Sequence, residues 1–523
     1  MKRLTKEDVR KILAQRFSEG FLSLRDIPRP DTLKDLQKAA KRIAQAINER
    51  QNIVVVGDYD VDGVVSTTLM KEFFAAIDYP VRTIIPNRFK HGYGLSKSII
   101  EEVRDTDLII TVDNGISAIE AAQYCKELGI DLIITDHHTP GETLPEAYAI
   151  VNPKQNSCDF AFSDICGAQV AWFLIGGLKA ELGLELDMKR FLDILAIAII
   201  ADIMPLRHIN RPLVQAGLKM FERSERPAVK FLRSVLKKHA FSSEDLAFTV
   251  APVINSAGRM DDAKIALDFL SAEDFFSASV YYARLLALNS QRKAEERRVY
   301  NECLQQVRGD EHCIVVAGED WNEGVVGIVA SRVMDRFKKP AIVLTKKGEL
   351  YKGSGRSLGE VDLFGLLQDS AHLLERFGGH KKAAGLAVRG DNLAAFRSHI
   401  DALAAKLPKE AFIDASKVLG ELPFSEIDWE LIDILEAYAP YGESNPMPRF
   451  AALDVEVLEA RMVGESANHL LMTLRKDGRI FKAIKFKHEK PLKKERIDLV
   501  FSPARNIFNN NQYIQLFVTQ IME

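Results

Sequence analysis

The stretch Asn52–Met70, NIVVVGDYDVDGVVSTTLM, determines the fold of the chain. It begins with a β-branched apolar run, residues 53–56, which predicts a buried strand. Gly57 ends this run, and three aspartates follow at alternate positions: Asp58, Asp60 and Asp62. Gly63 is expected to permit a tight turn into an apolar-periodic helix over residues 64–77. The stretch therefore predicts carboxylates at the carboxyl end of a strand, where open α/β sheets bind ligands.

Three carboxylates packed this closely repel one another, so a bound cation would relieve the repulsion. Oxygen ligands at this density suit Mg²⁺ or Mn²⁺. A solvated acidic turn and a single calcium loop are the alternatives that the stretch leaves open. The calcium loop of an EF-hand also requires a glutamate at its last position between two helices, and this stretch supplies none.

Composition limits the class of protein. The chain has 523 residues, of which 47% are hydrophobic, so it can bury several cores and we expect about three or four domains. A net charge of −3 excludes a globally basic surface, so a polyanion would bind local patches. The five cysteines form no CxxC pair, which favours reduced thiols in a cytoplasmic protein. The charged N-terminus lacks a signal-peptide core and every apolar run is short, so we expect no membrane association.

Three further strands are predicted at regular spacing, over residues 81–85, 107–112 and 131–135, with a helix over 117–128. Strands and helices that alternate in this way predict a doubly wound, mostly parallel sheet. Polar residues come directly after these elements and after the apolar run 194–201: Asp113, then Asp136, His137 and His138, then Asp202. The carboxyl ends of parallel strands share one edge, so all these side chains are expected to meet there.

Each of these residues has an ordinary interpretation when taken singly. An aspartate after a strand is often a turn former or a helix N-cap, and a lone histidine is often a satisfied core residue. Four such coincidences at one sheet edge instead favour a metal site of mixed carboxylate and imidazole ligands. That ligand set suits two Mn²⁺ or Mg²⁺ ions bridged by one aspartate, an arrangement that serves phosphoester hydrolysis.

The motifs GDYDVDG (57–63), VDNG (112–115) and TDHH (135–138), followed by Asp202, resemble the ordered motifs of the DHH phosphoesterase superfamily. The resemblance implies five metal ligands, namely Asp60, Asp62, Asp113 as the bridging one, His137 and Asp202. It also implies three catalytic side chains around them. These are Asp58 as a further ligand or water-orienting carboxylate, Asp136 to orient the imidazole of its neighbour, and His138 as a hydrogen-bond donor or general acid.

An uninterrupted helix is predicted from Ala263 to about Val307, and we interpret it as a rigid connector, with a coiled coil as the alternative. A second α/β unit follows, with strands over 313–317 and 341–344. It carries two glycine-rich stretches, expected as loops: KGSGRS (352–357) and GGHKKAAG (378–385). The second resembles the hallmark of the DHHA1 domain of nucleic-acid-cleaving members. The sequence contains no Walker A motif, which excludes a P-loop motor.

The C-terminal part predicts a small barrel of the OB type. Short alternating strands are expected over residues 469–474, 479–486, 497–501 and 513–521. Residues 461–505 contain twelve Lys/Arg against five Asp/Glu, interleaved with three aromatic residues: Phe481, Phe486 and Phe501. Aromatic platforms in a basic groove are typical of single-strand binding, whereas a solvated basic face is the alternative.

DHH, DHHA1 and OB-like parts in this order, with the joint YGESNP (441–446), resemble the RecJ family of single-strand-specific 5′→3′ DNA exonucleases. The resemblance implies two-metal hydrolysis of single-stranded DNA to 5′-mononucleotides, in DNA repair and recombination. The strand would thread between the two α/β domains through a gap too narrow for duplex. Six residues would bind it: Arg88, Ser354 and Arg356 at the 5′-phosphate, Arg259 and His380 near the scissile bond, and Gly379 as a further substrate-binding residue.

We expect an N-terminal helical segment (1–50), a DHH domain (51–260), a connector helix (261–310), a DHHA1 domain (311–410), a linker (411–450) and an OB-like domain (451–523). The resemblance further implies a monomer whose partners are a single-strand-binding protein and a RecQ-type helicase. The chain departs from the family at Asn322, where histidine is frequent, and in the turn 505–511, which is poor in glycine. The other functions left open are a phosphodiesterase for short oligoribonucleotides or cyclic dinucleotides, and an inactive single-strand-binding scaffold.

Overall fold

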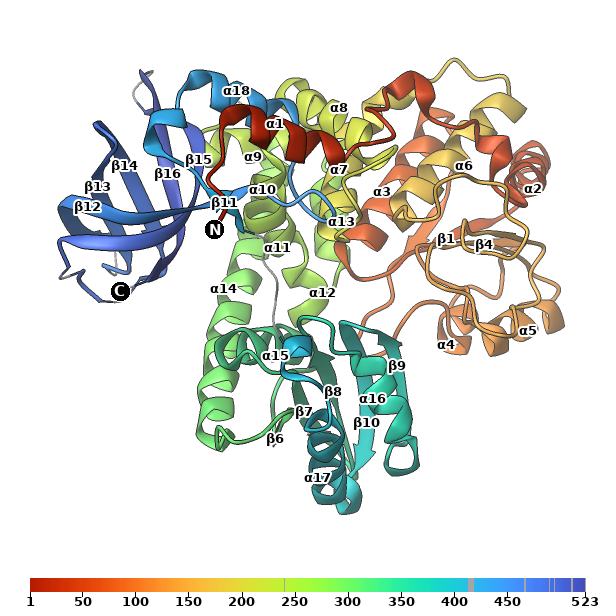
Figure 1. The fold of residues 1–523 in the computed structure, drawn as a ribbon. Helices are drawn as coiled ribbons and strands as arrows, with labels where there is room; N and C mark the ends of the chain where they lie inside the picture. The colour runs from red at the N-terminus through yellow and green to blue at the C-terminus, as the bar shows by residue number, and fades with distance from the viewer. Residues whose placement is uncertain are drawn as a thin grey trace.

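The computed structural model of the chain describes residues 1–238, 240–412, 418–464, 467–488, 490–492, 494–508 and 511–522. Three lobes, each built on one sheet, make up this described part (Figure 1). The first sheet is parallel, the second is mixed, and the third closes into a barrel. The predicted multidomain α/β architecture with an OB-like barrel is thereby confirmed. Among the described helices, none is long and apolar enough to cross a membrane.

The first sheet has the strand order β2-β1-β3-β4-β5, with every pair parallel. Its strands are β1 (Ile53–Val56), β2 (Arg82–Ile84), β3 (Leu108–Val112), β4 (Asp131–Thr135) and β5 (Ala149–Val151). Alternate residues of each strand enter two different cores, because successive side chains point to opposite faces. One face packs on α2 (Leu36–Asn48), α3 (Val61–Ala76) and α6 (Gly167–Glu181), and the other on α4 (Lys97–Glu101) and α5 (Ile119–Glu127).

Helix α3 begins at Val61, so Gly63 lies inside its first turn and does not form the turn that we expected before the helix. A Cβ at Gly63 would lie 2.5 Å from the carbonyl oxygen of Asp58. Glycine is therefore needed here because the helix start packs against the preceding loop. Asp60 is the N-cap of the helix, and its Oδ1 accepts a hydrogen bond from the Gly63 N–H at 3.0 Å.

A helical layer continues the first lobe. It contains α7 (Leu192–Ala201), α8 (Asn210–Arg223), α9 (Pro227–Leu236), α10 (Ser243–Asp245), the π-helix η4 (Leu246–Val250), α11 (Ala251–Ile254), α12 (Ser256–Met260) and α13 (Lys264–Leu270). The long connector α14 starts only at Phe275 and ends at Gln306, so the predicted start at Ala263 was wrong. Asp274 caps it, with Oδ1 accepting from the Ser277 N–H at 2.7 Å. This capping box starts α14 shortly after α13 has ended at Leu270, without glycine or proline between the two helices.

The second sheet has the order β6-β7-β8-β10-β9 and carries α15 (Glu323–Phe337), α16 (Leu363–Asp369) and α17 (Leu393–Ala404). Its strands are β6 (Ile314–Gly318), β7 (Ala341–Lys347), β8 (Leu350–Arg356), β9 (Arg376–His380) and β10 (Ala383–Arg389). The two glycine-rich stretches are therefore mainly strands, which corrects the expected loops. A Cβ at Gly353 would lie 1.9 Å from the Val343 carbonyl oxygen, so glycine lets β8 pair with β7. Asn322 caps α15 through its Oδ1, which accepts from the Gly324 N–H at 2.7 Å.

The third sheet contains β11 (Val418–Glu421), β12 (Arg449–Val463), β13 (His469–Lys476), β14 (Arg479–Phe486), β15 (Arg496–Phe508) and β16 (Asn511–Met522). Antiparallel pairing of β12 with β15 closes it into a barrel. Helices α18 (Trp429–Ala437) and α1 (Lys6–Gln15) pack on its core, so the N-terminal helix belongs to the C-terminal lobe (Figure 1). In the glycine-poor turn 505–511, Asn509 and Asn510 lie outside the described residues.

Two of the three aromatic residues that we expected to form a binding platform are buried in the barrel, so that prediction was wrong for them. Phe501 is fully buried and Phe481 is 8% exposed, because both fill the barrel core. Phe486 is 51% exposed, and its ring stacks on Phe517 at 6.4 Å and lies edge-on to His469 at 5.1 Å. Alternation along a strand places only one of each two neighbours on the surface, so a count of aromatics overestimates the platform.

Candidate metal centre and substrate clefts

The predicted ligands meet at the carboxyl edge of the parallel sheet. His137 follows β4, Asp113 follows β3, Asp62 lies in the first turn of α3, and Asp202 is the C-cap of α7. The Nε2 atom of His137 lies 3.3 Å from Asp113 Oδ1, 3.5 Å from Asp202 Oδ2 and 3.7 Å from Asp62 Oδ2. Side chains from four separate segments thus converge on one point.

The donor atoms of the described residues form three overlapping groups, with ligand atoms within 4.8 Å of one another in each. Asp62, His137 and Asp202 make one group, and Asp58, Asp60 and Asp113 make another. The third, Asp113, His137 and His138, shares one residue with each of them. Four of these buried atoms have no hydrogen-bond partner: Asp58 Oδ1, Asp113 Oδ1, His137 Nδ1 and Asp202 Oδ2. Buried polar atoms are normally satisfied, so the orphaned atoms fit a pair of oxygen- and nitrogen-binding cations.

The electrostatics of the cluster also favour bound cations. Burial, followed by repulsion from neighbouring carboxylates, raises the pKa of Asp58, Asp113 and Asp202 well above the usual range. Burial and Asp60 raise the pKa of Asp62 to about 6, and burial lowers the pKa of His137 to about 3. A neutral imidazole is the form that binds metal, and clustered carboxylates need a cation as counter-charge.

Backbone groups hold the cluster in place. Asp62 accepts hydrogen bonds from the N–H groups of Gly167 and Ala168, at 2.6 and 2.9 Å, at the start of α6. A Cβ at Gly167 would lie 2.4 Å from Asp113 Oδ1, so only glycine fits beside that carboxylate. Asp113 itself has φ +62°, a strained conformation that is typical of functional sites.

Asn114 is a positioning residue that the sequence did not reveal. Its Nδ2 donates to the carbonyl oxygens of Val56 and Gly57 at 3.1 and 2.9 Å, and its Oδ1 accepts from the Leu95 N–H at 3.1 Å. The side chain is fully buried, so it ties the ends of β1 and β3 to the loop 85–95. Taken alone, the Asp-Asn-Gly motif predicts only a turn, so nothing in the sequence indicated this role.

Asp136 contacts the ring of His138, whereas we expected it to orient the adjacent His137. Its Oδ1 lies 2.7 Å from His138 Nδ1 and also accepts from the backbone N–H groups of both histidines. Burial opposes protonation of His138, but the Asp136 hydrogen bond and the charges of Asp136, Asp202 and Asp60 together outweigh it and raise the pKa of His138 to about 9. Tyr93, absent from our predicted residues, places its hydroxyl 3.4 Å from His138 Nε2.

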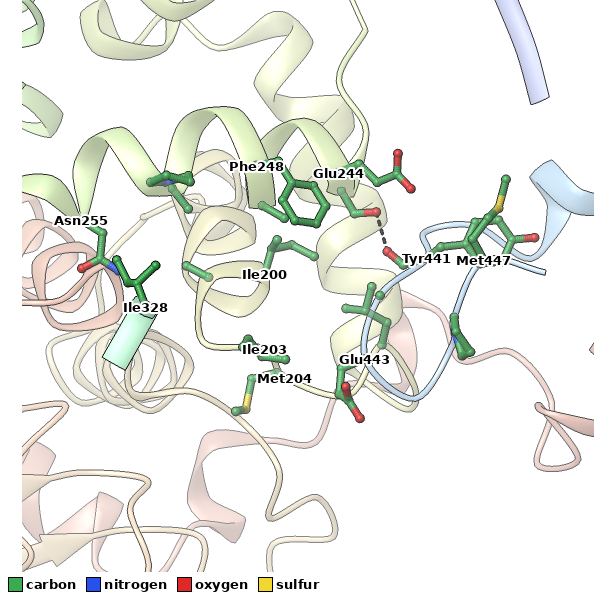
Figure 2. A pocket seen from close by; sticks show the side chains of 18 of the residues that line it. Ile200, Ile203, Met204, Glu244, Phe248, Asn255, Ile328, Tyr441, Glu443 and Met447 are labelled. Carbon is green, nitrogen blue, oxygen red and sulfur yellow. Dashed lines mark hydrogen bonds between the residues drawn. The ribbon is translucent and has the colours of Figure 1, made fainter. Parts of the chain in front are cut away.

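Two cavities flank the metal cluster. A cavity of about 850 Å³ lies between the parallel sheet and the second sheet, and it is lined by Tyr93, Asp136 and His138 on one side and by Ser354 and Gly379 on the other. Figure 2 shows the second cavity. Its volume is about 570 Å³, and its lining extends from Ile203, next to Asp202, to Arg449 at the start of β12. Ile203 and Phe248 are 67% and 78% exposed along this second cavity.

Of the predicted cationic residues, Arg259 lines one of these two cavities, whereas Arg88, Arg356 and His380 line neither. Arg259 lines the second cavity, donates to the Gly324 carbonyl oxygen at 2.9 Å, and has its pKa lowered to about 10 by burial and by the nearby Arg88. Arg88 stacks over the Tyr59 ring at 4.2 Å. Arg356 and Ser354 both lie next to Gly327. A Cβ added at Gly327 would lie 3.0 Å from Arg356 Nη2 and 3.4 Å from Ser354 Oγ. His380 is exposed at the end of β9 and lines neither cavity.

Three family profiles match the chain in order. The DHH family, N-terminal domain, matches residues 52–199, the DHHA1 domain matches 310–406, and the RecJ OB domain matches 420–520. The solved structure of Thermus thermophilus RecJ in complex with Mn²⁺ is similar with a TM-score of 0.81 at 30% identity, covering 94% of this chain and 72% of that one. The Mg²⁺ complex from the same organism is similar with a TM-score of 0.76 at 28% identity, covering 94% and 70%.

Curated relatives extend the similarity over nearly the whole chain. The single-stranded-DNA-specific exonuclease RecJ of Haemophilus influenzae is 32% identical, over 95% of this chain and 92% of that protein. Its Bacillus subtilis counterpart is 36% identical over 94% of this chain, which spans 63% of that longer relative. With all three domains matched in order, the chain belongs to the RecJ family.

Proposed function

We propose that the protein is a metal-dependent exonuclease that removes 5′-mononucleotides from single-stranded DNA in the 5′→3′ direction. The observation that carries the proposal is the cluster of ligand groups at one sheet edge, linked through Asp113 and His137, in a chain of the RecJ family. Relatives named single-stranded-DNA-specific exonucleases and structures that contain Mn²⁺ or Mg²⁺ support the substrate and the cations. The family relationship also supports a role in DNA repair and recombination.

The roles of the site residues follow from their contacts. Two divalent cations, held by Asp58, Asp60, Asp62, Asp113, His137 and Asp202, would neutralise the phosphate and activate the attacking water. His138 is protonated at neutral pH because Asp136 raises its pKa, so it can give a proton to the departing 3′-oxygen. Asp136 keeps that ring oriented, and the Tyr93 hydroxyl bounds the space beside it.

The two cavities support a direction for the strand. Ser354 and the Gly379 backbone line the cavity between the α/β domains and, with Arg88 and Arg356 close by, suit a terminal 5′-phosphate. The remaining strand would leave along the second cavity, where Phe248 and Ile203 offer apolar contact to bases and Arg259 offers charge to phosphates (Figure 2). A blunt duplex digested efficiently without a helicase would contradict this path.

Replacing Phe486 by alanine is expected to weaken single-strand binding by about 1–3 kcal/mol, because an exposed aromatic ring stacks on a base. Fluorescence anisotropy of a labelled oligonucleotide, with Ca²⁺ in place of Mn²⁺, measures the affinity without cleavage. Phe276→Ala is the matched control, since Phe276 is 76% exposed on α14, away from the barrel. Equal affinities for the two variants would remove Phe486 from the binding surface.

The test of the function uses purified protein, Mn²⁺ and a single-stranded oligonucleotide labelled separately at each end, with Asp113→Asn in parallel. We expect the wild type to release labelled mononucleotide from the 5′ end immediately, and we expect no such release from the variant. Tight binding without cleavage would indicate an inactive scaffold. Cleavage restricted to very short oligoribonucleotides or to cyclic dinucleotides would indicate the alternative phosphodiesterase.

The cellular setting is a proposal of the same kind. We infer a cytoplasmic monomer that acts beside a single-strand-binding protein and a RecQ-type helicase, since a single-strand nuclease needs an unwound substrate. Co-sedimentation of the purified protein with each candidate, with and without single-stranded DNA, tests the association.

A further inference from the structure

The segment between α18 and β12, residues 438–447, belongs to the barrel lobe and contacts the first lobe, and we call it the joint. Side chains of the first lobe bind its backbone directly. Arg211 of α8 donates through Nη2 to the carbonyl oxygens of Ala437 and Ala439, at 2.9 and 3.0 Å. Gln215, one turn further on, donates to the Ala439 oxygen as well, at 2.8 Å. Two residues of a catalytic-lobe helix therefore satisfy carbonyl groups at the end of a barrel-lobe helix.

Arg211 is also held from its other side. Its guanidinium lies 3.9 Å from the ring centre of Phe21 and 5.4 Å from that of Phe17, and the residue is 5% exposed. A planar guanidinium can stack on rings and donate to two carbonyl groups at once, whereas the ammonium group of lysine cannot. The N-terminal segment, which packs on the barrel core through α1, is thus joined to the first lobe at this arginine.

Asn445 stiffens the joint from within. It is fully buried, and its Nδ2 donates to the carbonyl oxygens of Tyr438 and Pro440 at 2.8 and 2.9 Å. Its Oδ1 accepts from Arg16 at 3.1 Å, just beyond α1. All the polar groups of this side chain are satisfied within the joint and its neighbour, which predicts one well-defined conformation.

The joint also borders the route from the metal cluster to the barrel. The Leu206 N–H, four residues beyond Asp202, donates to the Glu443 carbonyl oxygen at 2.8 Å. On the opposite side, Ser243 Oγ donates to the Tyr441 carbonyl oxygen at 2.7 Å (Figure 2). Tyr441, Glu443 and Met447 line the second cavity, and the barrel follows at Arg449.

We propose that the joint is a rigid spacer that sets the distance between barrel and metal cluster, with Arg211 and Asn445 as its positioning residues. One strand then occupies both sites at once, and this inference rests on the proposed exonuclease function. A rigid spacer of matching span raises the effective concentration of the second site, so affinity increases with strand length once the barrel is reached. The same residues contribute nothing to strands too short to reach the barrel.

The test measures KM and kcat on single strands of about 5 to about 40 nucleotides, which bracket the site size of one OB fold. For Arg211→Lys and Asn445→Ala, KM on the longest strands is expected to rise about 10–100-fold, while both constants on the shortest strands stay at wild-type values. Gln215→Leu, a milder change that removes one hydrogen bond, is expected to give a smaller rise in the same direction.

Arg332→Lys is the matched control, because Arg332 also stacks on an aromatic ring, Tyr300 at 4.1 Å, and lies away from the joint. Wild-type dependence of KM on length in all three joint variants would overturn the inference, and so would a loss of activity that is equal at every length. Failure of the exonuclease function itself would be distinct, since the wild-type protein would then cleave no strand.

Discussion

Replacement of Asp113 by asparagine is expected to lower the rate of strand cleavage by at least about 10³-fold. Loss of residues that merely support metal ligands costs about 10–100-fold, and a direct ligand should cost more. Asp113 lies 3.3 Å from His137 and also belongs to the ligand group of Asp58 and Asp60, so it touches both halves of the cluster. An amide cannot replace the charge that holds two cations together.

The variant gives a second readout that does not depend on activity. Mn²⁺ binds the folded protein, so it should raise the melting temperature of the wild type, and Asp113→Asn should lose that rise. Without metal the variant is expected to be the more stable of the two, because it removes a buried like charge. Asp105→Asn, at an exposed aspartate just before the opposite end of β3, is the control and should behave as wild type. An unchanged Mn²⁺-dependent rise in Asp113→Asn would remove Asp113 from the metal centre.

Replacement of His138 by alanine is expected to reduce kcat by about 10²–10⁴-fold, the usual contribution of a general acid. Asp136 Oδ1 lies 2.7 Å from the ring and raises its pKa to about 9, so the proton is present at neutral pH. The side chain faces the cavity between the two α/β domains, where the terminal nucleotide is proposed to lie. Binding of the strand itself should change little.

A substrate with sulfur in place of the first bridging 3′-oxygen separates this role from a structural one. A thiolate leaves without a proton, so His138→Ala should cleave this linkage at nearly the wild-type rate if the histidine is the acid. Tyr93→Phe, which removes only the hydroxyl at 3.4 Å, is the control and should lose less than about 10-fold. An equal loss on both linkages would contradict the general-acid role.

The positions of the metal-site residues along the chain could be predicted because parallel strands bring their carboxyl ends to one edge. Asp113 and His137 come at the ends of β3 and β4, so their convergence required only the correct order of strands, whereas Asp202 ends helix α7 and reaches the site through packing of that helix. Strand β5 was missed, although β2, which is equally short, was predicted. Tyr93 and Asn114 were missed because each acts through a contact with a residue distant in sequence, and no local pattern encodes such a contact.

The sequence by itself determined the class of each lobe, the order of the lobes and the residue types of the metal ligands, because hydrophobic periodicity and residue type are local properties. Only the tertiary structure decided which of the barrel aromatics reaches the surface, since Phe481 and Phe501 differ from Phe486 in facing the core. It alone decided that Asp136 supports His138, and that α1 packs on the barrel at the far end of the chain. Only the tertiary structure shows the contacts of Arg211 and Asn445 with residues 16–21 and 437–440, because packing between lobes depends on surfaces that no single segment contains.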